Sequence, residues 1–140
     1  MDPSRRPDRL GQAVTLARGD IVIAVFPGEL GKPRPAVVLQ RDELVGLFST
    51  ILACPMTTHL IDAPTLRPII VPNPENGLQE VSQIMVEKLS PLKRDVIRQR
   101  IGRLSTDELK RLETALIHIT GLDLASGPRN EAENGGKQLP

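Results

Sequence analysis

Residues 20–40 read DIVIAVFPGELGKPRPAVVLQ and contain two short β-type runs, at 20–26 and 36–40. Residues of high strand propensity fill both runs, and prolines and glycines separate them. The connecting stretch, residues 27–35, holds two glycines and three prolines and is longer and less regular than a tight hairpin turn. We therefore expect two strands joined by a loop of the kind that often carries function.

Four further β-type runs follow along the chain. They lie at residues 50–54, 68–71, 82–89 and 96–103. Short strands separated by turn-forming residues are typical of a barrel or a sandwich. The chain is therefore expected to be mainly β.

One helix is predicted after the last strand. Ser105 and Glu108 have the spacing of a capping box, in which each side chain accepts a hydrogen bond from the other's backbone N–H. Gly121 is a natural C-terminal stop. Apolar residues recur between them at helical spacing: Leu109, Leu112, Leu116 and Ile119. Because this apolar stripe needs a sheet to cover, we expect a β-barrel with a C-terminal helix packed on it.

The length of 140 residues suits one domain with a real core. We assign this domain to residues 18–122. Residues 1–17 carry prolines and charges and are expected to form a flexible arm, whereas residues 123–140 have almost no apolar content and are expected to be a disordered tail.

The composition excludes several classes of nucleic-acid-binding protein. A net charge of +1 is too weak for binding by bulk electrostatics, so any contact with nucleic acid must be local. The only aromatic residues are two phenylalanines, which argues against the stacking platforms of RRM and typical OB-fold proteins.

Metal, cofactor and membrane functions are also disfavoured. The single cysteine, Cys54, allows neither an internal disulfide nor a cysteine-based zinc site, and no His/Asp/Glu cluster has ligand spacing. We expect no metal and no cofactor. The sequence has no apolar run of bilayer length and no secretory h-region, which predicts a cytoplasmic protein with no membrane association.

Short motifs occur along the chain in a fixed order. They are RGDIV at 18–22 leading to RPAVVL at 34–39, CPMTT at 54–58, SQIMVEKL at 82–89 and IGRLS at 101–105. As an ordered set over about residues 18–122, they resemble the MazF/PemK (Kid-type) toxin family of type II toxin–antitoxin systems. Each motif alone is weak, whereas the set is specific.

The resemblance implies an SH3-like barrel of the CcdB/MazF type that forms a homodimer. It implies sequence-selective, metal-independent cleavage of single-stranded RNA, including mRNA, which inhibits translation and growth. The products would be a 2′,3′-cyclic phosphate and a 5′-hydroxyl end. The partner would be a MazE-like antitoxin. The catalytic arginine and threonine of the family fall on Arg34 and Thr57.

These two residue types fit the chemistry of RNA cleavage. The guanidinium of Arg34 is always protonated and offers forked donors to the phosphate oxygens that gain charge in the transition state. The hydroxyl of Thr57 holds its proton too tightly to be a base unaided, so we expect it to hydrogen-bond the phosphate or the 2′-hydroxyl.

The residues that transfer protons are left open. Further candidates for catalysis or RNA binding are Glu29, Thr58, His59, Glu87 and Lys88. Lys88 follows Glu87 where many members of the resembled family have glutamine, so their base specificity cannot be carried over. Weaker candidates for an extended basic track are Arg67, Lys93, Arg94 and Arg98. His118 is expected to be structural or exposed.

Two other readings have different functions. A CcdB-like gyrase poison would share the barrel, but that toxin acts through a C-terminal aromatic residue, and this chain has no tryptophan. A non-catalytic barrel that only binds a partner peptide is the second alternative. Intact RNA after long incubation with the purified protein would favour it.

Overall fold

The computed structural model describes residues 15–28 and 31–122. The predicted tail at 123–140 lies outside the described residues, as does the predicted arm apart from residues 15–17. Leu16, which precedes the predicted domain boundary at residue 18, is only 2% exposed and packs into the core. The packed part of the chain therefore includes Leu16.

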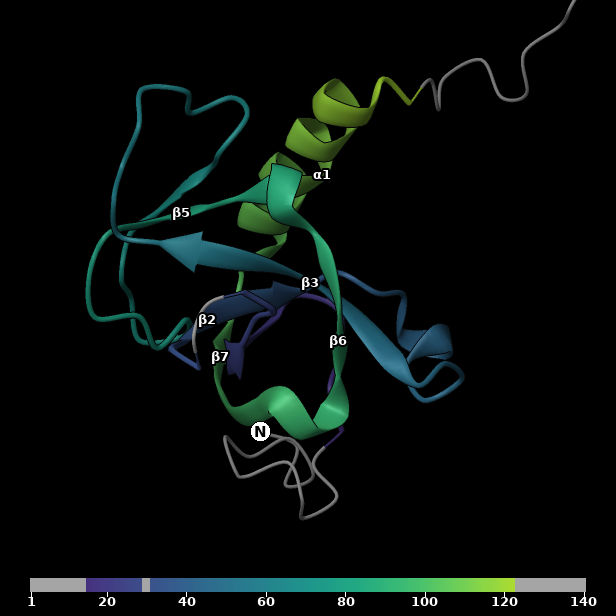
Figure 1. The fold of residues 1–140 in the computed structure, drawn as a ribbon. Coiled ribbons are helices and arrows are strands. Elements are labelled where there is room, and N and C mark those ends of the chain that lie inside the picture. Colours follow the sequence, from purple (N-terminus) through teal and green to yellow (C-terminus); the bar gives the residue numbers. More distant parts are fainter. Residues whose placement is uncertain (1–14, 29–30, 123–140) are drawn as a thin grey trace, which may run out of the picture.

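The described residues form one curled antiparallel sheet followed by a helix, as Figure 1 shows. The strand order is β4-β5-β3-β2-β1-β7, and β6 also pairs with β3. This confirms the predicted β-rich barrel with a C-terminal helix. The strands are β1 (Asp20–Val25), β2 (Pro33–Val38), β3 (Thr50–Thr57), β4 (Ile69–Ile70), β5 (Ser82–Ile84), β6 (Ser90–Lys93) and β7 (Ile97–Arg103).

The central strands β1, β2 and β3 carry buried side chains on both faces. Because side chains alternate along a strand, Val22 faces a cluster inside the curl of the sheet, whereas its neighbour Ile21 faces a second cluster beneath the helix. Val38 and Val37 divide between the two clusters in the same way. The unbroken apolar runs in the sequence are thus explained by two cores that share one set of strands.

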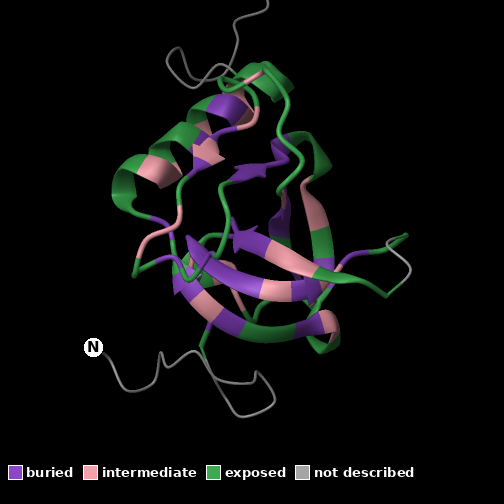
Figure 2. Cartoon of the chain, turned by 90° about the vertical axis from the view of Figure 1, so that its left-hand side faces the viewer, coloured by how far each residue is buried: buried purple, intermediate pink, exposed green. Residues whose placement is uncertain are grey.

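The helix α1 (Thr106–Thr120) begins and ends where its capping residues predict. The Ser105 hydroxyl accepts a hydrogen bond from the Glu108 backbone N–H at 3.1 Å, and the Glu108 carboxylate accepts one from the Ser105 N–H at 2.9 Å. Gly121 adopts the left-handed conformation at φ 74° that closes the helix. Leu112 and Ala115 are fully buried against the sheet. Figure 2 shows buried positions along the strands and on one side of the helix.

A buried ion pair joins the first strand to the last. Asp20 at the start of β1 is fully buried, and its Oδ1 lies 3.3 Å from Nε of Arg100 on β7. Its Oδ2 accepts a hydrogen bond from the Ala17 N–H at 2.8 Å. Asp20 therefore fixes the entry of the chain into the barrel as well as the closure by β7.

The observed β3 extends to Thr57, three residues beyond its predicted end at residue 54. The strands also depart from the prediction in two larger ways. Within the predicted strand at residues 82–89, only β5 is a strand, and a one-turn 3-10 helix η4 (Val86–Lys88) follows it. The next strand, β6, begins at Ser90 and was not predicted. The turn places Val86 in the core at 1% exposure while Glu87 and Lys88 remain exposed, which an extended run in this region would not allow. An apolar run alone does not reveal such a break.

The second departure concerns residues 33–35, which we expected in the loop. They belong to β2, where Arg34 pairs with Ala24 of β1. Within the described chain, pairing of β2 with β3 starts only at Ala36. Proline lacks an N–H donor and is tolerated where one side of a strand is unpaired, so Pro33 and Pro35 fit this position.

Candidate active site

Arg34 is held at the start of β2 with its side chain half-buried. Its Nη1 donates a hydrogen bond to the backbone carbonyl of Met56 on β3 at 3.3 Å. Met56 directly precedes Thr57, so this bond ties the guanidinium to the strand that carries the second predicted catalytic residue. The adjacent Pro33 and Pro35 restrict the backbone on either side of it.

Thr57 is the last residue of β3. Its Oγ1 accepts a hydrogen bond from the backbone N–H of His59 at 3.0 Å. Because one lone pair of the hydroxyl is used in this way, the O–H proton is directed elsewhere. The turn therefore fixes the position of the Thr57 oxygen and leaves its O–H able to donate.

A cavity of about 290 Å³ brings the two predicted residues together. Thr58, which was predicted as a further candidate, lines the same cavity. Two cationic side chains, Lys32 and Arg34, give it the charge needed to hold a phosphate. The lining residues are Lys32, Pro33, Arg34, Pro35, Met56, Thr57, Thr58 and Ser82.

Glu87 and Lys88 line a neighbouring cavity of about 370 Å³, and Arg34 lines both cavities. Glu87 accepts hydrogen bonds from Nε of Arg67 at 3.2 Å and from Nη2 of the same guanidinium. Partial burial raises the pKa of Glu87, but the hydrogen bond and the positive charges of Arg67 and Lys88 outweigh it and hold the pKa below its usual range. An ionised, paired carboxylate of this kind is poorly suited to general acid catalysis.

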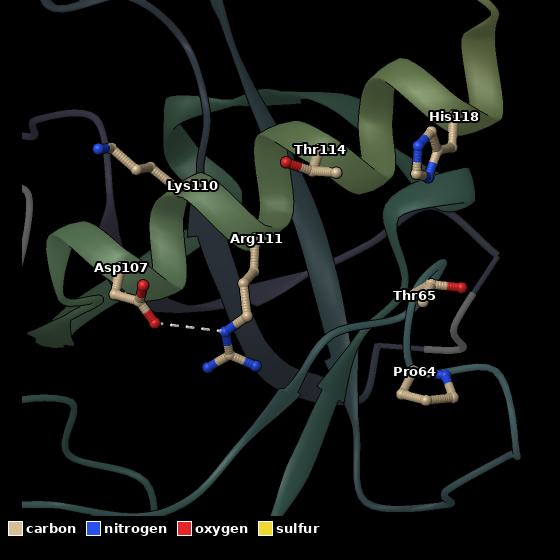
Figure 3. A pocket seen from close by; sticks show the side chains of 7 residues that line it. All are labelled: Pro64, Thr65, Asp107, Lys110, Arg111, Thr114 and His118. Atoms are coloured by element: carbon tan, nitrogen blue, oxygen red, sulfur yellow. Dashed lines mark ion pairs between the residues drawn. The ribbon is translucent and has the colours of Figure 1, made fainter.

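The remaining predicted residues have different surroundings. His59 is exposed, and its hydrogen bond to Thr57 is made by its backbone N–H. Glu29 lies outside the described residues. His118 lines a third cavity of about 270 Å³ between α1 and the loop with Pro64 and Thr65. Figure 3 shows His118 pointing from the helix towards that loop, together with the ion pair of Arg111 and Asp107.

Gln83 is a positioning residue that the sequence reasoning missed. Its side chain is fully buried, and its Oε1 accepts a hydrogen bond from the Ile61 N–H at 2.8 Å. Its Nε2 donates to the carbonyls of Ile61 at 3.0 Å and Arg67 at 2.9 Å. Gln83 thus clamps the loop that leaves Thr57. A polar side chain within the apolar run at residues 81–86 was the available signal.

The described residues contain neither a metal-binding cluster nor a membrane-spanning helix. Within residues 15–28 and 31–122, no three His, Cys, Asp or Glu side chains are grouped so that they would hold a metal ion. No helix in the same two ranges combines the length and apolar composition needed to span a bilayer.

The chain combines a small curled antiparallel sheet, a capped C-terminal helix, and a surface cavity that holds an arginine and a threonine. These are the features expected of a toxin of the MazF/PemK type. The sequence profile of the family described as PemK-like, MazF-like toxin of type II toxin-antitoxin system matches residues 17–120. The chain belongs to this family. The resemblance drawn from the sequence motifs is confirmed.

Individual relatives agree with this assignment. A protein of Mycolicibacterium smegmatis named probable endoribonuclease MazF is 37% identical over 108 residues, covering 76% of this chain and 98% of the relative. The solved structure of Mycobacterium tuberculosis toxin MazF-mt6 has a TM-score of 0.65 at 22% identity, covering 74% of this chain and 98% of that one. An endoribonuclease from a mycobacterial species, solved in complex with its cognate antitoxin, has a TM-score of 0.64 at 17% identity, covering 77% and 97%. These two structures support the MazF-type barrel.

Proposed function

We propose that this toxin is an endoribonuclease that cleaves single-stranded RNA, with Arg34 and Thr57 as its catalytic residues. The observation that carries the proposal is the shared cavity, in which a fixed guanidinium and an oriented hydroxyl lie together. Membership of the toxin family and the relative named as a probable endoribonuclease support the same activity.

The proposed reaction is an intramolecular transesterification of RNA. The ribose 2′-oxygen forms a bond to the adjacent phosphorus, and the bond from phosphorus to the 5′-oxygen breaks. The 2′-hydroxyl proton passes to a base, and the leaving 5′-oxygen takes up a proton. Charge accumulates on the non-bridging oxygens, where Arg34 supplies charged donors and Thr57 supplies its O–H. Glu29, His59 and Glu87 remain our candidates for the proton transfers, with Glu87 as a base because its lowered pKa keeps it ionised.

The partners and location follow from the same proposal. We infer that the toxin forms a homodimer in the cytoplasm and is inhibited by a MazE-like antitoxin, as the mycobacterial relative is bound to its own antitoxin. Lys32, Arg34 and Lys88 line the two neighbouring cavities and would attract an acidic antitoxin segment as well as RNA phosphates. Residues 18–122 constitute the proposed catalytic domain.

Purified protein tests the activity directly. Wild type, Arg34→Ala and Thr57→Val are incubated with a long unstructured RNA in the presence of EDTA, and the new 5′-hydroxyl ends are counted. Loss of one preorganised donor typically lowers the rate about 100-fold, so we expect that reduction or more for Arg34→Ala. Arg41→Ala replaces an exposed arginine that lines neither active-site cavity, so it is the matched control and should cut at the wild-type rate.

Each alternative predicts a different result. RNA that stays intact with wild type would indicate a barrel that only binds its partner. Poisoning of DNA gyrase without RNA cleavage would indicate a CcdB-like toxin. Wild-type cutting by Arg34→Ala would remove that residue from the mechanism.

A further inference from the structure

A cavity of about 390 Å³ adjoins the candidate active site. Pro35, Thr58 and Ser82 line both cavities, so the two cavities lie side by side. The adjoining cavity extends over β7 and the loop before β5. Its other lining residues are Ile23, Gly77, Leu78, Gln79, Glu80, Gln99 and Ile101.

The loop that forms one wall of this cavity is held firmly against β7. Gly77 has a φ of +70°, and a Cβ at this position would lie 2.2 Å from the backbone carbonyl oxygen of Ile101. The buried side chain of Asn76 donates to the Val71 carbonyl at 2.9 Å and accepts from the Leu78 N–H at 3.0 Å. The cavity is therefore preformed, which lowers the entropic cost of binding a ligand.

The polar groups of this cavity differ from those of the active site. Among its described lining residues none is a lysine or arginine, whereas Gln79, Gln99 and Glu80 contribute two amides and a carboxylate. The carboxylate of Glu80 disfavours a phosphate. Side-chain amides and carboxylates hydrogen-bond the edges of unpaired bases, and the carboxylate in particular accepts from an exocyclic amino group.

The apolar surface of the cavity suits the face of a base. Ile23, Leu78 and Ile101 lie beside the polar groups, together with Pro35. Ligand pockets of this kind are mainly apolar, with a few polar groups that fix orientation. The cationic residues Lys32 and Arg34 lie in the active-site cavity next door, which separates the place for phosphate from the place for a base.

We infer that this cavity is a base subsite for an unpaired nucleotide next to the cleaved phosphate. Gln79, Glu80 and Gln99 read a base that carries an exocyclic amino group and discriminate against uracil, which has none. This inference rests on the proposed ribonuclease function and adds a source of its sequence selectivity.

Cleavage mapping provides the first test. Wild type, Gln79→Leu and Gln99→Leu are incubated with a long unpaired RNA, and the cut sites are aligned. We expect one position beside the wild-type cut to be depleted of uracil, and each variant to accept uracil there while still cutting. One well-made amide contact to a base corresponds to about 5- to 150-fold discrimination. Thr114→Ala on α1 is the control, and its cut sites should match those of wild type.

A binding experiment separates this inference from the activity itself. Fluorescent oligo(A), oligo(C) and oligo(U) are titrated against the chain carrying Thr57→Val, with and without Gln79→Leu and Glu80→Gln. Tighter binding of oligo(A) and oligo(C) than of oligo(U), lost in the combined variant, supports the subsite even where wild type cuts nothing. An equal preference with and without these substitutions, or the same cut-site alignment in all cleaving variants, overturns it.

Discussion

Replacing Gln83 with leucine should loosen the loop that follows Thr57 and destabilise the whole domain. Leucine is close to glutamine in size, so the substitution leaves little cavity in this fully buried position. It removes hydrogen bonds to the Ile61 N–H, the Ile61 carbonyl and the Arg67 carbonyl. Each is worth about 1 kcal/mol, and water satisfies part of the exposed loop, so we expect a net loss of about 1–3 kcal/mol.

Urea unfolding and amide hydrogen exchange measure this effect. A loss of about 2 kcal/mol moves the urea midpoint by roughly 1 M for a domain of this size. The Ile61 amide, which donates to Gln83, should exchange faster in the variant than the amides of the central strands. Gln79→Leu is the matched control, because Gln79 is exposed. Its free energy of unfolding should change by less than about 0.5 kcal/mol.

The refuting result is specific. If Gln83→Leu unfolds at the wild-type urea concentration and the Ile61 amide keeps its wild-type exchange rate, then the Gln83 side chain does not hold the loop. RNA cleavage by the variant is a separate readout. A lower rate together with an unchanged midpoint would place Gln83 in positioning Thr57 rather than in stability.

Two further predictions concern titratable groups. Burial, with a smaller contribution from Glu87, raises the pKa of the Cys54 thiol to about 12. Iodoacetamide at pH 8 should therefore label the native protein at least about tenfold more slowly than the urea-unfolded chain, and equal labelling rates would contradict the burial. Glu87→Gln removes the partly exposed ion pair with Arg67 and should cost at most about 1 kcal/mol at pH 7. Because folding lowers the pKa of Glu87, the ion pair stabilises the folded state fully above the ordinary carboxyl pKa of about 4.3. This stabilisation is lost as the pH falls through the lower pKa of the folded state, so the urea midpoints of wild type and variant should converge in acid. A gap that stays constant with pH would contradict this.

Local signals in the sequence predicted the elements that depend on local contacts. The helix was found because Ser105 and Glu108 cap each other three residues apart, and Gly121 closes the last turn. The break at Val86 was missed because it depends on which side chains the core accepts. Pro33 and Pro35 fall in the predicted loop because prolines usually interrupt strands. Their place in β2 depends on pairing with β1 alone, which only the assembled sheet reveals.

The candidate site divides in the same way. Arg34 and Thr57 were located from short motifs, and the structure places them in one cavity. The contact of Glu87 with Arg67 joins residues 20 positions apart, and that of Gln83 with Ile61 joins residues 22 positions apart. Such pairs are created by strand pairing, which one sequence does not display.

The closure of the barrel by β7 has a consequence for synthesis of the toxin. Asp20 enters the fold near the beginning of the chain, but its buried partner Arg100 is made 80 residues later. A growing chain on the ribosome therefore cannot bury the Asp20 carboxylate opposite Arg100 until nearly all of the domain has been synthesised, and burying this charge without that cation is strongly unfavourable. Fragments released before β7 is complete should therefore lack the closed barrel and be open to proteolysis.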